Sequence, residues 1–173
     1  MLDGSGSFET FQMIKKFVIE IVKRFKLSTK GTHAGVITFG NAHAELSIKM
    51  GDHTDINSFI NALNNLPHPR GSIYDILGAM EIAQMDFFAP SYGSGSLARQ
   101  TLVIVTDGLK ANDPTRNIGA NMASRGIRII TVGVGVGIDK DRLRRLAGGK
   151  NQVRNRLFNQ IFRCYVCFTQ VMI

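Results

Sequence analysis

The chain has 173 residues, of which 44% are hydrophobic and 20% are charged. These values are typical of one globular domain with a sizeable core, and they exclude a disordered chain, a collagen-like repeat and a small disulfide-stapled protein. Lysine and arginine exceed aspartate and glutamate by 21 to 13, a net charge of +8. Four of the cations fall in the last 25 residues, which contain no acid. We therefore interpret the charge as a solvated exterior with a basic end, and expect no nucleic-acid partner.

Two further classes are not expected. No apolar run approaches the roughly 20 residues that a membrane-spanning helix needs, so the sequence predicts no membrane insertion. Cys164 and Cys167 form one C-x-x-C within an aromatic, β-prone run, without a second pair or a nearby histidine to complete a zinc site. A redox C-x-x-C would open a helix after a strand, so we interpret both as ordinary thiols.

The first half of the chain begins with apolar residues at three- and four-residue spacing from Phe8 to Phe25, which predicts an amphipathic helix. Its cations, Lys15 among them, lie between the apolar positions and are assigned to the polar face. The elements predicted after it are strands over 32–39 and 44–50, which form a hairpin around Gly40, and helices over 55–66 and 74–87.

The second half predicts strands over 101–106 and 128–136 and helices over 117–125 and 140–146. This alternation predicts an α/β fold with a doubly wound, mostly parallel central sheet, helices on both faces and one antiparallel edge strand. Such sheets bind ligands beyond the carboxyl ends of their strands, so the functional residues are sought in loops 3–8, 71–75 and 107–113.

The first of these loops, D-G-S-G-S at residues 3–7, places one carboxylate and two hydroxyls on alternate residues. Its glycines let the backbone wrap tightly, so alternate oxygens can converge on one point, and Mg²⁺ favours oxygen ligands. A serine-rich helix cap, with Ser7 as the cap, explains the same residues without a metal. Asp107, which follows the strand over 101–106, adds a carboxylate within reach of the same cation, although Asp-Gly also favours turns.

Over residues 1–147 the chain resembles a von Willebrand factor type A domain. The resemblance depends on LDGSGSF at 2–8, TFG at 38–40, VIVTDG at 103–108 and VGVG at 132–135. It implies a metal-ion-dependent adhesion site for Mg²⁺ or Mn²⁺, whose coordination a partner's acidic residue completes. The implied ligands are Ser5 and Ser7 directly, and Asp3 and Asp107 directly or through water.

The loop over 71–75 departs from the family pattern. The family's coordinating threonine falls on Ile73, which cannot ligate a metal, and neither substitute, Ser72 or Asp75, occupies the matching position. We therefore expect weakened cation binding, with water filling the vacancy. The resemblance implies partner contacts around the site, at Gly4, Gly6, Ser72, Tyr74 and Gly108.

Both ends of the chain also depart from the family. Only Met1 and Leu2 remain of its apolar first strand, so we expect that strand to be nearly absent. Residues 148–173 match neither the sixth strand nor the final helix, and we expect an out-of-family basic and apolar tail behind a 1–147 domain. Our hypothesis is a truncated gene model or splice form. The alternative is that residues 164–173 insert where a strand is missing.

The resemblance implies a non-enzymatic binding module, extracellular or secreted in its parent protein, for a matrix or cell-surface protein. A metal-independent or intracellular type A scaffold is the alternative. A phosphohydrolase of the haloacid dehalogenase type is more remote, because its chemistry needs a second carboxylate two residues after the first, where this chain has Ser5. We expect the four histidines at the surface and no enzyme activity.

Overall fold

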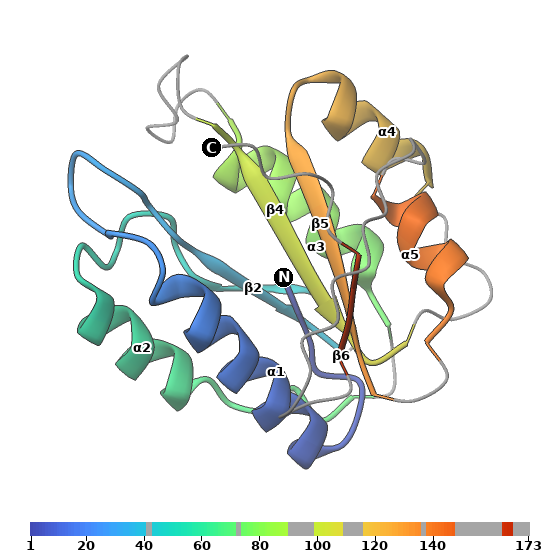
Figure 1. Cartoon of the computed structure of the whole chain (residues 1–173), viewed down its shortest axis with the longest axis horizontal. Coiled ribbons are helices and arrows are strands. Elements are labelled where there is room, and N and C mark those ends of the chain that lie inside the picture. The colour runs from blue at the N-terminus through green and yellow to red at the C-terminus, as the bar shows by residue number, and fades with distance from the viewer. Residues whose placement is uncertain are drawn as a thin grey trace.

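The computed structural model describes residues 1–40, 43–71, 74–89, 99–108, 116–135, 138–147 and 164–167. A six-stranded sheet with the order β3-β2-β1-β4-β5-β6 runs through them, and helices cover both of its faces (Figure 1). The strands are β1 (Leu2–Asp3), β2 (Val36–Phe39), β3 (Glu45–Ile48), β4 (Thr101–Thr106), β5 (Arg128–Val134) and β6 (Cys164–Cys167). The predicted α/β fold with a mostly parallel central sheet is confirmed.

The sheet carries antiparallel strands at both edges, whereas the sequence predicted one. Strand β3 runs antiparallel to β2, as the hairpin prediction requires. Strand β6 runs antiparallel to β5, with Cys164 opposite Val134, so part of the 164–173 run does form a strand. It occupies the edge beside β5, not the central position of β1. The side chains of the two cysteines lie outside the described structure.

Strand β1 has only two residues, as expected, yet it keeps its place in the middle of the sheet. Leu2 lies opposite Thr38 of β2 on one side and opposite Val105 of β4 on the other, both in parallel register. Leu2 is 2% exposed, so even this short strand contributes to the core. The two strands beside it are thereby joined through β1 at the end where the candidate site lies.

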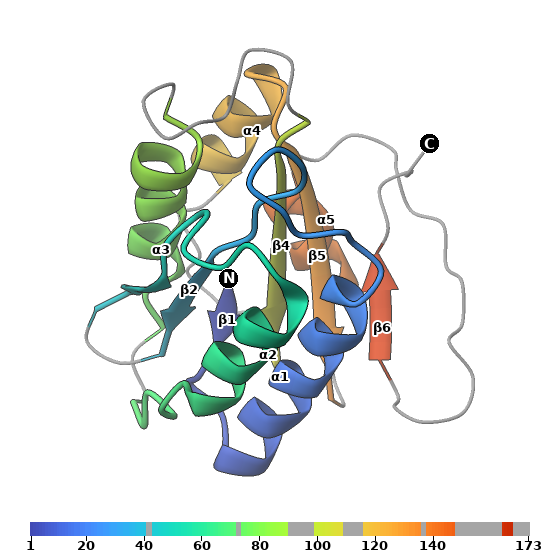
Figure 2. The same cartoon turned by 90° about the vertical axis from the view of Figure 1, so that its left-hand side faces the viewer.

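Helices α1 (Phe8–Val22) and α2 (Ile56–Asn65) pack side by side on one face of the sheet (Figure 2). The other face carries α3 (Ile76–Ile82), which continues as the π-helix η1 (Ala83–Phe87), with α4 (Arg116–Ser124) and α5 (Lys140–Leu146). Each face has its own apolar core, because the side chains of a strand alternate between the two faces of a sheet. Within the described ranges no helix is long and apolar enough to cross a membrane.

Helix α1 corrects three predictions. Lys15, assigned to the polar face, is 3% exposed, and its Nζ donates to the carbonyl oxygens of Asn64 (2.9 Å) and Leu66 (3.2 Å) at the end of α2. Phe8 and Phe25, predicted to face the core, are 54% and 51% exposed. Phe8 is the first residue of α1 and Phe25 follows its end, so neither lies on the stripe that packs against the sheet.

The other boundaries follow the predictions closely. The strand over 101–106 and the helix over 140–146 are found with the predicted bounds. Strand β2 is shorter than the predicted 32–39, because Thr32 makes only an isolated bridge to Leu27. Helix α3 begins after Asp75, whose side chain caps it, and not at residue 74.

Candidate functional site

The candidate site lies where the neighbouring strands β1 and β4 end. Loop 3–7 follows β1 and leads into α1, and Asp107 follows the last residue of β4. Because β1 and β4 are parallel neighbours, their carboxyl ends meet at the same edge of the sheet. The topology therefore brings together the two loops that the sequence analysis singled out.

Asp3 is 1% exposed, and both of its carboxylate oxygens accept hydrogen bonds. Oδ1 accepts from the backbone N–H (2.9 Å) and from the hydroxyl (2.7 Å) of Ser5, and Oδ2 accepts from the hydroxyl of Thr106 (2.5 Å). Burial raises the pKa of Asp3 above its ordinary value, while these hydrogen bonds act in the opposite direction. The bonds fix the orientation of the carboxylate and tie loop 3–7 to the end of β4.

Asp107 places a second carboxyl group beside the loop. A Cβ added to Gly6 would lie 2.0 Å from Asp107 Oδ2, so the loop approaches this side chain as closely as a glycine allows. Burial raises the pKa of Asp107, and the negative charge of Asp3 raises it further. In the described part of the chain, ion pairs join Lys23 to Glu20, Arg142 to Asp139 and Arg144 to Asp141. None of these pairs includes Asp3 or Asp107.

Three more contacts position the same loop. A Cβ on Gly4 would lie 2.4 Å from the ring of Pro69, and a Cβ on Gly40, whose φ is +130°, would lie 2.3 Å from the backbone nitrogen of Ser5. The backbone N–H of Gly4 also donates to the carbonyl of Phe39 at 2.6 Å. Loop 3–7 thus packs between the end of β2 on one side and Pro69 on the other. The sequence analysis did not predict that Gly40 contacts this loop.

Ser7 is the N-cap of α1, as the cap interpretation predicted. Its hydroxyl accepts from the backbone N–H of Thr10 at 3.2 Å, and the side chain is exposed. A hydroxyl oxygen has two acceptor lone pairs, so capping leaves capacity for a second partner. The cap and the metal interpretation of Ser7 are therefore compatible.

His68 was predicted to be a surface residue, but it is only partly exposed and contacts the loop. Its Nε2 lies 3.2 Å from the carbonyl oxygen of Gly6. The ring packs against Phe11 at 5.3 Å between centroids and edge-on against Phe8 at 6.0 Å. The sequence signal for this role is the Pro67-His68-Pro69 string, in which the prolines restrict the backbone on both sides of the histidine.

The third predicted loop is described only in part, because Ser72 and Ile73 lie outside the described residues. Asp75 accepts from the backbone N–H of Gly78 and of Ala44, each at 3.0 Å, so it caps α3 and holds the turn before β3. The ring of Tyr74 packs edge-on against Phe39 at 5.4 Å and joins the core on that face. Gly108 is open: a Cβ there would meet nothing within 4 Å.

The residues of the site fit a hard divalent cation. The group consists of two carboxylates, Asp3 and Asp107, and the hydroxyls of Ser5 and Ser7, and oxygen donors of this kind suit Mg²⁺ or Mn²⁺. No cluster of three or more His, Cys, Asp or Glu side chains occurs among the described residues, so they form no alternative site rich in acids or imidazoles. Close acids with raised pKa values are relieved of mutual repulsion when a cation binds between them.

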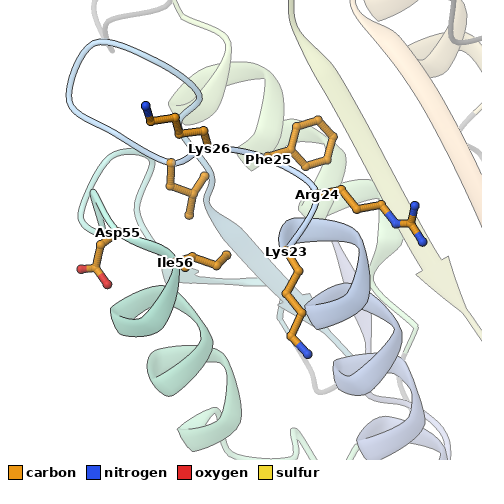
Figure 3. Close-up of a pocket in the computed structure, with 7 residues that line it drawn as sticks. Lys23, Arg24, Phe25, Lys26, Asp55 and Ile56 are labelled. Carbon is orange, nitrogen blue, oxygen red and sulfur yellow. The ribbon is translucent and has the colours of Figure 1, made fainter.

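One hollow in the described surface lies away from this site. It opens between the end of α1 and the beginning of α2, about 22 Å along α1 from Ser7 at 1.5 Å per residue. The charged ends of Lys23, Arg24 and Lys26 point in different directions around it (Figure 3). Lys23 is paired with Glu20 at 2.7 Å. The hollow therefore has no set of cations that converge on one anion.

A family model for the von Willebrand factor type A domain matches residues 1–162. The collagen alpha-1(XXI) chain of Xenopus laevis is 27% identical over 149 residues, covering 85% of this chain and 15% of the collagen. Human integrin alpha-E is 24% identical over 139 residues, covering 78% of this chain and 12% of the integrin. The chain thus spans less than a sixth of the length of these relatives.

Two solved structures share the fold. Proximal thread matrix protein 1 from the mussel byssus, with a zinc-occupied MIDAS motif, superposes with a TM-score of 0.74 at 21% identity, covering 84% of this chain and 39% of that one. Manganese-loaded Plasmodium vivax TRAP protein superposes with a TM-score of 0.75 at 18% identity, covering 90% and 63%. At these identities the likeness shows the fold alone.

Proposed function

Because the chain belongs to the von Willebrand factor type A domain family, we propose that it is a non-enzymatic protein-binding module with a divalent cation site at loop 3–7 and Asp107. The collagen and integrin relatives support a matrix or cell-surface protein as the partner, and an extracellular location of the parent protein. We place the domain at residues 1–147 and treat 148–173 as a tail that adds β6 to its edge, although the family model extends to residue 162.

The observation that carries the proposal is the arrangement of Asp3. Its carboxylate is buried and held by Ser5 and Thr106, and Asp107 lies beside the same loop without an ion pair in the described part of the chain. In our assignment Ser5 and Ser7 coordinate Mg²⁺ or Mn²⁺ directly, and the two acids act directly or through water. The bound cation would supply an open coordination position for an acidic side chain of the partner.

The partner-contacting surface follows from this assignment. Of the residues expected to contact a partner, Gly108 has open space around it. Gly4 and Gly6 instead pack closely against Pro69 and Asp107, and the ring of Tyr74 packs in the core against Phe39. We propose Ser72 as a substitute ligand for the cation. Asp75 is less suited to this role, because its side chain caps α3. Because Ile73 replaces the expected threonine, we propose weak cation binding, and partner binding without a cation is the second candidate.

Thermal unfolding of the whole chain in EDTA and in Mn²⁺ or Mg²⁺ tests the proposal. A cation present at 100 times its dissociation constant adds about 2.7 kcal/mol to the free energy of unfolding, which is enough to raise the Tm by several degrees. Asp3→Asn and Asp107→Asn should abolish this rise, and Ile73→Thr should enlarge it. Asp52→Asn, at an exposed acid in a turn, is the matched control and should retain it. A cooperative transition that no cation shifts would favour the second candidate.

A further inference from the structure

The segment Pro67-His68-Pro69 touches loop 3–7 at two points. The ring of Pro69 is the surface against which Gly4 packs, and His68 Nε2 lies 3.2 Å from the carbonyl oxygen of Gly6. A carbonyl oxygen can only accept, so Nε2 of His68 carries the proton and donates. The loop thereby receives one apolar and one polar contact from a segment 62 residues away in the chain.

We propose that His68 is a positioning residue for the cation site, which rests on the function proposed above. Gly6 stands between Ser5 and Ser7, the two hydroxyls assigned to the cation, and on its other side it packs against Asp107. A hydrogen bond to the Gly6 carbonyl fixes the orientation of the peptide group between Gly6 and Ser7, and thereby the position of Ser7 relative to Ser5. His68 therefore acts on the cation through the loop backbone and does not coordinate it.

The His68 side chain is itself held in place. Its ring packs against Phe11, which is 1% exposed, and against Phe8 in the first turn of α1. The proline on each side restricts the backbone, since proline fixes its own φ and favours an extended conformation for the residue before it. A donor with so little freedom loses little entropy when it bonds Gly6, so the contact is well suited to hold a loop.

Three variants of the whole chain separate the hydrogen bond from the packing. His68→Phe keeps a ring against Phe8 and Phe11 but removes the donor, His68→Gln offers an amide N–H near the position of Nε2, and His68→Asn offers one that falls short of it. We expect His68→Phe to weaken Mn²⁺ binding, measured by titration calorimetry, about 3- to 10-fold. His68→Gln should recover most of the affinity, and the Tm in EDTA should change little.

A second measurement needs no metal. Amide hydrogen exchange of residues 4–8 in EDTA should be faster in His68→Phe than in the unmodified chain, and His68→Gln should restore its rate. Unchanged exchange in this loop, or Mn²⁺ affinity equal in all variants, would overturn the role of His68. If the unmodified chain binds no Mn²⁺, the proposed cation site fails and so does the role of His68 for the cation; an exchange difference would then show only that His68 holds loop 3–7. If His68→Phe does not fold, the Mn²⁺ affinities of His68→Gln and His68→Asn are compared instead. A weaker affinity in His68→Asn supports the role of His68, and equal affinities overturn it.

Discussion

Asp3 and Thr106 share a buried hydrogen bond of 2.5 Å although 103 residues separate them in the chain. The hydroxyl of Thr106 also accepts from the backbone N–H of Gly108 at 3.1 Å, so one side chain joins β1, β4 and the loop after β4. The bond holds the carboxylate that the proposed cation site needs, and it stabilises the short central strand at its end.

Replacing Thr106 with valine should therefore affect both stability and cation binding. Thr106→Val keeps the shape of the side chain but removes the hydroxyl that donates to Asp3 Oδ2, which should lower the free energy of unfolding by about 1–3 kcal/mol in urea denaturation. It should also reduce the rise in Tm that Mn²⁺ produces. Thr38→Val is the matched control, because the Thr38 hydroxyl bonds Ser47 and not Asp3. An equal loss of the Mn²⁺ effect in both variants would contradict this role.

A methyl group at Gly6 should disable the cation site, whereas a methyl group at Gly108, the residue after Asp107, should be tolerated. In Gly6→Ala the new Cβ would lie 2.0 Å from Asp107 Oδ2, so this carboxyl group or the loop must move. We expect the Mn²⁺-dependent rise in Tm to be lost. In Gly108→Ala the Cβ meets nothing within 4 Å, and the rise should persist. If Gly6→Ala retains the full effect, Asp107 is not part of the site.

The effect of pH on the apo protein follows from the two acids. Both have pKa values raised above 3.8 in the folded state, so this state binds protons more tightly than the unfolded one, and their contribution to stability falls as the pH rises through the raised values. In EDTA, Asp107→Asn should therefore be more stable than the unmodified chain at pH 7, and the difference should shrink as the pH falls toward 4. Urea denaturation at several pH values measures it.

Cation binding should show the opposite dependence. Because the cation binds ionised carboxylates, its stabilising effect should be largest near neutral pH and disappear as Asp3 and Asp107 take up protons. The Tm difference between Mn²⁺ and EDTA, followed across the same pH range, gives this profile. A difference that persists unchanged at low pH would point to a cation site elsewhere.

The buried amino group of Lys15 should contribute to stability far from the cation site. Burial lowers the pKa of Lys15, but its Nζ donates to two carbonyls at the end of α2, where a cation is favourable. Lys15→Met should lower the free energy of unfolding by about 1–3 kcal/mol, because it leaves those carbonyls without this donor. Lys16→Met, one residue along and exposed, should change it by less than about 0.5 kcal/mol. Equal effects in urea denaturation would refute the assignment.

The sequence by itself determined the order and type of most elements as far as α5, and the loops in which the candidate site was sought. These features depend on local patterns: apolar spacing for α1 and α2, a continuous apolar run for β4, and alternating oxygens at residues 3–7. Asp107 could be added because the carboxyl ends of parallel strands meet at one edge. These patterns can be recognised without knowing which side chains contact one another in the folded protein.

Only the tertiary structure decided which residues support these elements. The burial of Lys15, the contact of His68 with Gly6 and the approach of Gly40 to the loop join segments far apart in the chain. The central position of the two-residue β1 and the antiparallel pairing of β6 depend likewise on strands that contribute from elsewhere in the sequence. A local pattern reports which face of a helix or strand is apolar, but the partner across that face is determined by how the elements pack.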